Sequence, residues 1–315
     1  MYKSFFGLRE NPFNVNPDPR YLFMTRHTEE ALACLTYGIQ TRRGFILLTG
    51  EVGTGKTTLL NKLLDWLHQK QMPTAFVFNP RLSVRQLFDF MLADFGIPCE
   101  TQMKSQVLMK LNHWLLERYR AGQTAVLVID EAQNLSPEAL EEIRLLTNLE
   151  TSTEKLLQIV LAGQPELEAK LNQPQLRQLR QRITLRCKLH PLTLEETRGY
   201  IRERLRIAGA DGEAIFSTEA VEAVHYYARG IPRVTNLLCE HALISTFADQ
   251  AKPVASSTIE AVAREFDLHQ FEPAASPAPA GENQSLMEAL RALPELMERL
   301  GLAEQILSGL RERKQ

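Results

Sequence analysis

The stretch that decides the fold is Gly50-Glu51-Val52-Gly53-Thr54-Gly55-Lys56-Thr57. It fits the pattern Gly-x-x-x-x-Gly-Lys-Ser/Thr at every fixed position. An apolar run over residues 45–49 precedes it, and a helical pattern over residues 57–69 follows it. Glycines at this spacing let successive backbone N–H groups surround phosphates, and the start of the following helix adds positive potential. The sequence therefore predicts a phosphate-binding loop between a strand and a helix.

The residue types in this loop indicate what each position does. The lysine of the pattern reaches the β- and γ-phosphates of a nucleotide, and the hydroxyl after it ligates Mg²⁺. We therefore predict ATP and Mg²⁺ as cofactors, with Lys56 acting in catalysis and Thr57 as a metal ligand. The residues predicted to bind the nucleotide are Gly50, Glu51, Val52, Gly53, Thr54, Gly55, Lys56, Thr57 and Thr58.

Two carboxylates follow another apolar run further along the chain. Residues 126–129 read Val-Leu-Val-Ile, and Asp130 and Glu131 come directly after them. Parallel α/β sheets bind their ligands at the carboxyl ends of strands, so both carboxylates are expected at the nucleotide. Phosphoryl transfer depends mainly on positioning and charge neutralisation. We predict that Asp130 holds Mg²⁺ and that Glu131 orients and polarises the attacking water.

Short apolar runs alternate with helical patterns in the first part of the chain. The runs cover residues 45–49, 75–78, 125–129 and 159–162, with helical stretches such as 84–95 and 106–119 between them. Strands that are apolar throughout indicate a parallel sheet covered on both faces. Beyond residue 193 the pattern is helical, at 194–207, 218–228, 233–249 and 258–266. The predicted fold class is α/β, a P-loop NTPase domain with a parallel sheet, followed by an all-helical lid domain and a C-terminal amphipathic helix.

Capping residues predict where several helices begin. Thr28 is expected to cap the helix that follows the lead-in segment. Thr193 with Glu196, and Ser257 with Glu260, have the spacing of capping boxes, in which each side chain bonds the other residue's free backbone N–H. These signals fix the start of two lid helices.

Composition shifts divide the chain into five segments. Residues 273–281 read Pro-Ala-Ala-Ser-Pro-Ala-Pro-Ala-Gly, which is a linker composition. Beyond it, leucines recur at four-and-three spacing and predict an amphipathic helix. This helix either packs on its own domain or serves self-association or docking. The predicted segments are the lead-in at 1–24, the α/β domain at 25–190, the lid at 191–270, the linker at 271–284 and the helix at 285–315.

The composition is that of an ordinary globular protein. Of the 315 residues, 44% are hydrophobic and 23% are charged, which argues against a disordered or fibrous chain. The formal net charge of -2 gives no overall attraction to nucleic acid, although a local basic patch fits within a neutral total. The cysteines and histidines have no spacing typical of metal sites or redox motifs. We expect reduced, partly buried thiols and histidines without a catalytic role.

Membrane and export signals are absent from the sequence pattern. No apolar run reaches the ~20 residues that span a bilayer, and residues 1–6 are not followed by the apolar stretch of a signal peptide. We expect a cytoplasmic protein without an integral membrane segment, which reaches the inner membrane through a partner.

Together these motifs resemble the AAA+ ATPases, and within them the ExeA/GspA family, named for an ATPase of the general secretion pathway. The resemblance covers roughly residues 1–268. It rests on the loop of residues 50–57 and on Phe6-Gly7-Leu8, Asn11-Pro12-Phe13, Pro17-Asp18-Pro19, Asp130-Glu131-Ala132-Gln133, Leu161-Ala162-Gly163-Gln164-Pro165-Glu166-Leu167 and Gly230-Ile231-Pro232-Arg233.

The resemblance implies further roles in ATP hydrolysis. Gln164 is similar to sensor 1, which contacts the γ-phosphate or the water, although many AAA+ relatives have Asn there. Arg233 is similar to sensor 2, which reaches from the lid to the phosphates. Arg182 falls where the arginine finger would lie, with Arg177 and Arg180 as rivals. A finger acting in trans implies a head-to-tail homo-oligomer, either a ring or a filament. The lead-in segment would lie near the adenine.

Two biological roles are compatible with these motifs. The first is an ATP-driven motor or switch for an envelope apparatus of the secretion, pilus or polysaccharide-export type, reached through the C-terminal helix. The second is an ATP-dependent regulator on duplex DNA, whose phosphates would meet Arg177, Arg180, Arg182, Arg186 and Lys188. A slow nucleotide-dependent scaffold is a third alternative. We favour the first role. The founding secretion ATPase also has a transmembrane segment and a peptidoglycan-binding domain, which we do not expect in this sequence, so a direct contact with the cell wall is not part of the expected role.

Overall fold

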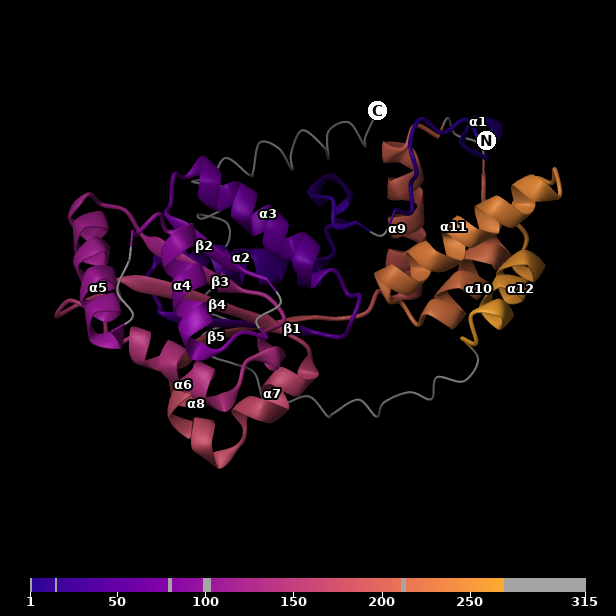
Figure 1. Cartoon of the computed structure of the whole chain (residues 1–315). Helices are drawn as coiled ribbons and strands as arrows, with labels where there is room; N and C mark the ends of the chain where they lie inside the picture. Colours follow the sequence, from indigo (N-terminus) through magenta and orange to yellow (C-terminus); the bar gives the residue numbers. More distant parts are fainter. Residues whose placement is uncertain (1, 15, 79–80, 99–102, 211–213, 269–315) are drawn as a thin grey trace. The chain divides into compact units, whose positions relative to one another are not determined.

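The structure is a computed structural model that describes residues 2–14, 16–78, 81–98, 103–210 and 214–268 (Figure 1). The predicted linker and C-terminal helix lie outside these residues, as do Cys99 and His269. The described chain divides into two compact units. The first contains the residues up to Thr28, Gly50–Lys62 and the chain from Leu189 onward, and the second contains Glu29–Thr49 and Leu63–Lys188. The segment bounds expected from the sequence stay a prediction.

The second unit is built on a five-stranded sheet. Its strands are β1 (Phe45–Gly50), β2 (Thr74–Val77), β3 (Ala125–Ile129), β4 (Leu157–Gly163) and β5 (Ile183–Leu189), in the order β2-β3-β4-β1-β5. The pairs β2–β3, β3–β4 and β4–β1 are parallel. This confirms the predicted parallel sheet and its first four strands. The order places β1 beside β4 rather than beside β2, so the chain crosses over the sheet between sequential strands.

The register brings the strand ends to one edge of the sheet. Thr49 of β1 pairs with Gly163 of β4, and Ile129 of β3 pairs with Leu161. The phosphate-loop sequence begins one residue after Thr49, Asp130 follows Ile129, and Gln164 follows Gly163. Three predicted functional segments therefore leave the sheet from neighbouring parallel strands, at their carboxyl ends.

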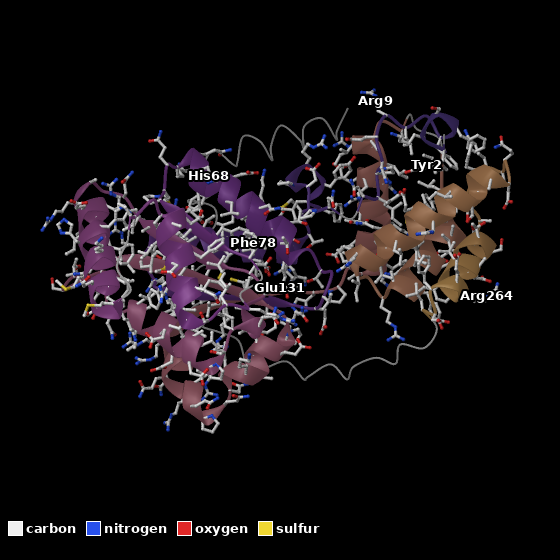
Figure 2. The ribbon with its side chains drawn as sticks, in the orientation of Figure 1. Tyr2, Arg9, His68, Phe78, Glu131 and Arg264 are labelled. Atoms are coloured by element: carbon white, nitrogen blue, oxygen red, sulfur yellow. The ribbon has the colours of Figure 1, made fainter. Side chains whose placement is uncertain are left out.

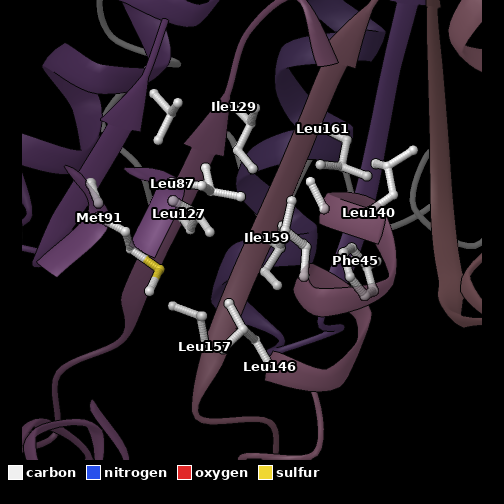
Figure 3. Packing of buried hydrophobic residues seen from close by; sticks show 14 of the residues in the cluster. Phe45, Leu87, Met91, Leu127, Ile129, Leu140, Leu146, Leu157, Ile159 and Leu161 are labelled. Atoms are coloured by element: carbon white, nitrogen blue, oxygen red, sulfur yellow. The ribbon is translucent and has the colours of Figure 1, made fainter. Parts of the chain in front are cut away.

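One face of the sheet is covered by helices that follow β2 and β3. These are α4 (Val84–Asp94), α5 (Lys104–Arg120) and α6 (Pro137–Leu146). Figure 3 shows Leu87 and Met91 of α4 and Leu140 and Leu146 of α6 among the alternate residues of β1, β3 and β4. Burial of apolar surface at about 25 cal/mol per Å² makes this cluster a main source of stability. The two short helices α7 (Pro165–Leu171) and α8 (Arg177–Arg182) extend the same cluster.

The opposite face of the sheet is buried as well. Ile46, Leu48 and Val128 are fully buried although their side chains alternate with those of the first cluster. Helix α2 (Arg26–Gln40) packs here, because a Cβ on its Gly38 would lie 2.6 Å from the Ile46 side chain. The predicted sheet with two covered faces is therefore confirmed.

Strand β5 was not predicted. Ile183, Leu185 and Cys187 are buried, whereas the intervening Thr184, Arg186 and Lys188 are exposed. This alternation of period two is the signal of a strand with one solvated face. β5 lies at the edge of the sheet. Its solvated face carries Arg186 and Lys188.

Helices form most of the regular structure of the first unit, which also contains the turn-rich lead-in and the loop between β1 and helix α3 (Lys56–Gln69). Its helices are α1 (Tyr2–Phe5), α9 (Leu194–Ile207), α10 (Thr218–Ala228), α11 (Pro232–Ala248) and α12 (Ser256–Glu265). They share an apolar cluster that also contains Phe6, Leu8 and Phe13 of the lead-in. Among the described helices of both units, none is long and apolar enough for a membrane crossing.

Helix starts follow the predicted caps in only one of three cases. The capping box of Thr193 and Glu196 at α9 is confirmed. The box of Ser257 with Glu260 is wrong, because α12 already begins at Ser256 and Ala255 occupies the cap position. The cap at Thr28 is also wrong, since α2 begins at Arg26 and the Thr28 N–H donates to the Thr25 hydroxyl at 3.2 Å. In both errors the helix begins earlier than the polar signal suggested.

The lead-in is fixed to the helical lid by a buried arginine. Arg204 of α9 donates to the carbonyl oxygens of Pro12 and Asn14, and its guanidinium lies 4.4 Å from the centre of the Tyr21 ring. Burial, followed by a hydrogen bond to Glu10, raises the pKa of Tyr21 to about 12, so this phenol stays protonated at neutral pH. The lead-in is thus a packed part of the first unit.

Candidate nucleotide site

The loop of residues 50–57 is held by its own side chains. Lys56 is only 5% exposed, and its ammonium donates to the carbonyl oxygens of Gly50 and Glu51 at 2.8 and 3.0 Å. The Thr54 hydroxyl also donates to the Glu51 carbonyl, at 2.8 Å. Gly53 and Gly55 have φ values of +81° and +97°, which residues other than glycine rarely adopt. This curled loop at the start of α3 has the form that cradles phosphates.

Arg233 lies directly against this loop. The Arg233 backbone N–H donates to the Gly53 carbonyl at 3.2 Å, and a Cβ on Gly53 would be 2.7 Å from the Cβ of Arg233. Arg233 is in the first turn of α11, and its side chain is exposed. The structure therefore brings together the loop and the residue predicted to act as sensor 2, two segments almost 180 positions apart in the sequence.

The lead-in also contacts the helix that follows the loop. Asn61 of α3 donates its side-chain N–H to the Pro17 carbonyl at 3.1 Å. Asn61 lies five positions after Lys56, so the Asn16-Pro17-Asp18 segment lies beside the first turns of α3. The expected position of the lead-in near the adenine stays a prediction.

Asp130 and Glu131 follow β3 in the second unit. Asp130 is 4% exposed, and its Oδ1 accepts the Glu131 N–H at 2.9 Å, which orients the carboxylate. Glu131, labelled in Figure 2, has left-handed backbone angles of φ 53° and ψ 37°. A residue with a side chain adopts this conformation at some cost, and such residues gather at functional sites. The turn reverses the chain immediately after the two carboxylates.

Two glutamine amides bind the Glu131 carboxylate. Its Oε2 accepts an N–H from Gln133 at 2.5 Å and one from Gln164 at 2.9 Å. Gln164 is the residue predicted as sensor 1, so the structure brings together two predicted residues from different strands. Gln133 was part of the family resemblance but was not predicted as a site residue.

The candidate metal ligands have the chemistry that Mg²⁺ requires. Thr57 offers a hydroxyl in the first turn of α3, and Asp130 offers a buried carboxylate at the end of β3. Mg²⁺ prefers oxygen ligands and is usually held by one or two protein oxygens together with substrate phosphates and water. Each of these residues therefore offers an oxygen of the kind that Mg²⁺ prefers.

Arg182 is held at the end of a neighbouring helix. Its guanidinium donates to the Thr147 hydroxyl and, at 2.8 Å, to the Asn148 side-chain oxygen. Both partners follow α6, where the negative end of the helix dipole favours a cation. Arg180 instead donates to the Asn172 side chain at 3.0 Å, and Arg177 is exposed.

Three cysteines are buried like apolar residues, and two of them, Cys34 and Cys187, are in contact. Cys34, Cys187 and Cys239 are buried free thiols. A hydrogen bond with Cys34, followed by burial, raises the pKa of the Cys187 thiol well above its usual value. Their wide spacing in the sequence gave no sign that Cys34 and Cys187 lie together. Within the described part of the chain, no group of three His, Cys, Asp or Glu residues could hold a metal ion.

One family model matches a continuous stretch of this chain. Residues 39–171 match the AAA domain family. The chain contains an AAA domain. This AAA domain spans the stretch from the end of α2 to α7, with β1, the phosphate loop, Asp130, Glu131 and Gln164. The predicted AAA+ fold is therefore confirmed.

One curated protein is similar to this chain over most of its sequence. It is 46% identical over 270 residues to the general secretion pathway protein A of Aeromonas hydrophila. The match covers 84% of this chain but 48% of the relative, so the chain spans about half of that protein's length. The resemblance to the ExeA/GspA family predicted from the motifs is confirmed by this identity.

Two solved structures have a fold similar to that of this chain. The ORC2 protein of Aeropyrum pernix matches with a TM-score of 0.62 at 15% identity, over 84% of this chain and 73% of that one. Cdc6p of Pyrobaculum aerophilum matches with a TM-score of 0.61 at 17% identity, over 84% of this chain and 70% of that one. At these identities the likeness concerns the fold alone.

Proposed function

We propose that this chain binds Mg-ATP on the loop Gly50–Thr58 and hydrolyses it to ADP and phosphate. The observation that carries this proposal is the carboxylate of Glu131, held by two amides at the end of β3. The neighbouring order of β3, β4 and β1 supports it, because β1 runs directly into the phosphate loop. A P-loop with a positioned carboxylate on the same sheet is the arrangement used for nucleotide hydrolysis.

The chain's own residues account for nucleotide binding in this proposal. Backbone N–H groups of the loop and the N-terminus of α3 would receive the phosphates. Lys56 would exchange the carbonyl oxygens of Gly50 and Glu51 for the β- and γ-phosphates, which offer stronger, charge-assisted hydrogen bonds. Arg233, seated on Gly53, would reach the phosphates from the lid.

The hydrolytic step rests on Glu131 and Gln164. Glu131 would accept a hydrogen bond from the attacking water and hold it in line with the γ-phosphate, while Gln164 would contact the γ-phosphate or the water. Bound Mg²⁺, held by Thr57 and Asp130, would neutralise charge on the phosphate oxygens. Arg182 would act as the arginine finger on a second copy, with Arg177 and Arg180 as rivals.

A finger supplied by a second copy requires a head-to-tail homo-oligomer. Such heterologous contacts close into a ring or continue as a filament. We propose that this assembly drives or switches the building of an envelope apparatus, in the cytoplasm and at the inner membrane through a partner. The 46% identity to a protein named for the general secretion pathway supports this role, and the C-terminal helix is our candidate for the docking segment.

The assembly can be tested by light scattering on the purified chain. Glu131→Gln is expected to trap the ATP-bound state, so its mass should rise to that of an oligomer with Mg-ATP and stay low with ADP. Duplex DNA is added in parallel at about 50 and about 200 mM salt, because phosphate contacts weaken steeply over this range.

The DNA arm separates the two biological roles. Assembly with ATP alone, unchanged by DNA at either salt concentration, is the expected result. In the alternative role the residues that would contact DNA are Arg177, Arg180, Arg182, Arg186 and Lys188, of which Arg186 and Lys188 are exposed on β5. If assembly requires DNA and fades at the higher salt concentration, the envelope role is replaced by that of a DNA-bound regulator.

A further inference from the structure

Gln133 is held in place on three sides. Its side-chain N–H donates to Glu131 Oε2 at 2.5 Å, and its side-chain oxygen accepts the Gln164 backbone N–H at 3.2 Å. Its backbone carbonyl accepts the ammonium of Lys170 at 2.5 Å. The residue therefore spans from the turn after β3 to the residue that follows β4.

Gly163 lies directly against this amide. A Cβ on Gly163 would lie 2.7 Å from the Gln133 side-chain oxygen and 2.8 Å from a Leu167 methyl group. A side chain at position 163 would crowd the bridging amide, and Gln133 is confined between the ends of β3 and β4 by its two side-chain hydrogen bonds. A confined amide has lost its rotamer freedom before the reaction begins, which is the condition for holding another group accurately.

The two amides on Glu131 differ in what else they must do. Under the proposed function, Gln164 turns toward the γ-phosphate or the water, and its hydrogen bond to Glu131 is then given up. The bond from Gln133 has no such competing task, because both ends of that side chain are tied within the protein. One donor therefore stays on the carboxylate while the other responds to the nucleotide.

We propose that Gln133 is the positioning residue for Glu131 in the ATPase reaction. Its N–H fixes the carboxylate oxygen Oε2 and leaves Oε1 to face the attacking water. Its side-chain oxygen links this orientation to the backbone of Gln164, so that the residues at the ends of β3 and β4 are aligned together. This inference rests on the proposed function and adds to it the residue that sets the geometry of the carboxylate.

Two substitutions test the donated hydrogen bond. Gln133→Leu removes both polar atoms, and Gln133→Glu keeps the shape but replaces the N–H donor by a second carboxylate. Both variants should lower the kcat for ATP about 10- to 100-fold, the loss that follows from a catalytic group misplaced by about 1 Å. The KM for ATP and the Kd for a fluorescent ATP analogue should change less than about threefold, because positioning acts after binding.

Gln158→Leu is the matched control. Gln158 is a fully buried glutamine of β4 whose side chain bonds the Gly44 N–H at 2.8 Å and the Lys155 carbonyl at 2.9 Å. Its loss should lower the thermal unfolding midpoint and leave kcat within about twofold at a temperature where the variant is folded. A purely structural role of Gln133 would produce this same pattern.

The outcomes separate the two proposals. Wild-type turnover with a kcat loss confined to the two Gln133 variants supports the inference. The inference is overturned if either Gln133 variant keeps the wild-type kcat. It is also overturned if Gln158→Leu lowers kcat as much as the Gln133 variants do. Both results leave the ATPase proposal intact. A wild-type chain that binds the analogue but releases no phosphate overturns the proposed function, and the inference with it.

Discussion

Glu131→Gln is expected to lower the kcat for ATP about 10²- to 10⁴-fold, the usual contribution of a general base. The glutamine has the same shape and keeps an oxygen that can accept an N–H from Gln133 or Gln164. It cannot accept a proton from the water or provide the negative charge that polarises it. ATP binding should therefore be retained, with a Kd within about threefold of the wild-type value. Phosphate release and equilibrium binding of a fluorescent ATP analogue measure the two quantities.

The matched control for this substitution is Glu141→Gln. Glu141 is a carboxylate of the same unit that accepts from the Arg144 guanidinium at 2.8 Å, on α6. The same chemical change there should leave kcat within about twofold, because Glu141 is partly exposed and the glutamine oxygen can still accept from the Arg144 guanidinium. Turnover by Glu131→Gln at the wild-type rate would remove Glu131 from the mechanism.

Arg182→Ala is expected to lower kcat about 10³-fold or more, the effect typical of an arginine finger. The guanidinium now donates to Thr147 and Asn148 of its own chain, so the variant also loses a contact at the end of α6. Asn148→Ala is the control for that loss, because it removes an acceptor of Arg182 at the end of α6 and leaves the guanidinium in place. If Arg180→Ala or Arg177→Ala carries the large loss instead, the finger is that residue.

Mixing two inactive variants distinguishes a finger that acts in trans from one that acts in cis. Arg182→Ala retains Glu131, and Glu131→Gln retains Arg182, so an interface between them can combine both residues. In a random mixture of equal amounts, about a quarter of head-to-tail interfaces would be complete. Mixing should therefore restore phosphate release to about a quarter of the wild-type rate. No recovery, with oligomers present by light scattering, would contradict action in trans.

The parts of the fold that sequence predicted are those set by local rules. The loop was found because its glycines, lysine and threonine are needed at fixed spacing. Strands β1 to β4 were found because buried parallel strands are apolar throughout. Strand β5 was missed because its exposed Arg186 and Lys188, close to Arg180 and Arg182, were interpreted as a basic run, although the alternating burial from Ile183 to Leu189 is a strand pattern.

The parts of the site that sequence missed depend on tertiary structure. The role of Gln133 follows from the left-handed conformation of Glu131, which directs the next residues back toward β4, and no sequence spacing encodes that turn. Arg204 gave no signal either, since its partners are backbone carbonyls of the lead-in nearly 200 positions away. The available sequence signal for Gln133 and Arg204 was a polar side chain within a helical or apolar stretch, and that signal does not indicate a partner.

The measurement that tests the central claim most directly is phosphate release from ATP by the wild-type chain over a range of chain concentrations. Lys56→Ala and an excess of EDTA serve as blanks, because one removes the phosphate-binding ammonium and the other removes Mg²⁺. We predict turnover that requires Mg²⁺, is lost in Lys56→Ala, and rises per chain as the concentration favours head-to-tail contacts. Phosphate release that never exceeds the Lys56→Ala blank would contradict the account.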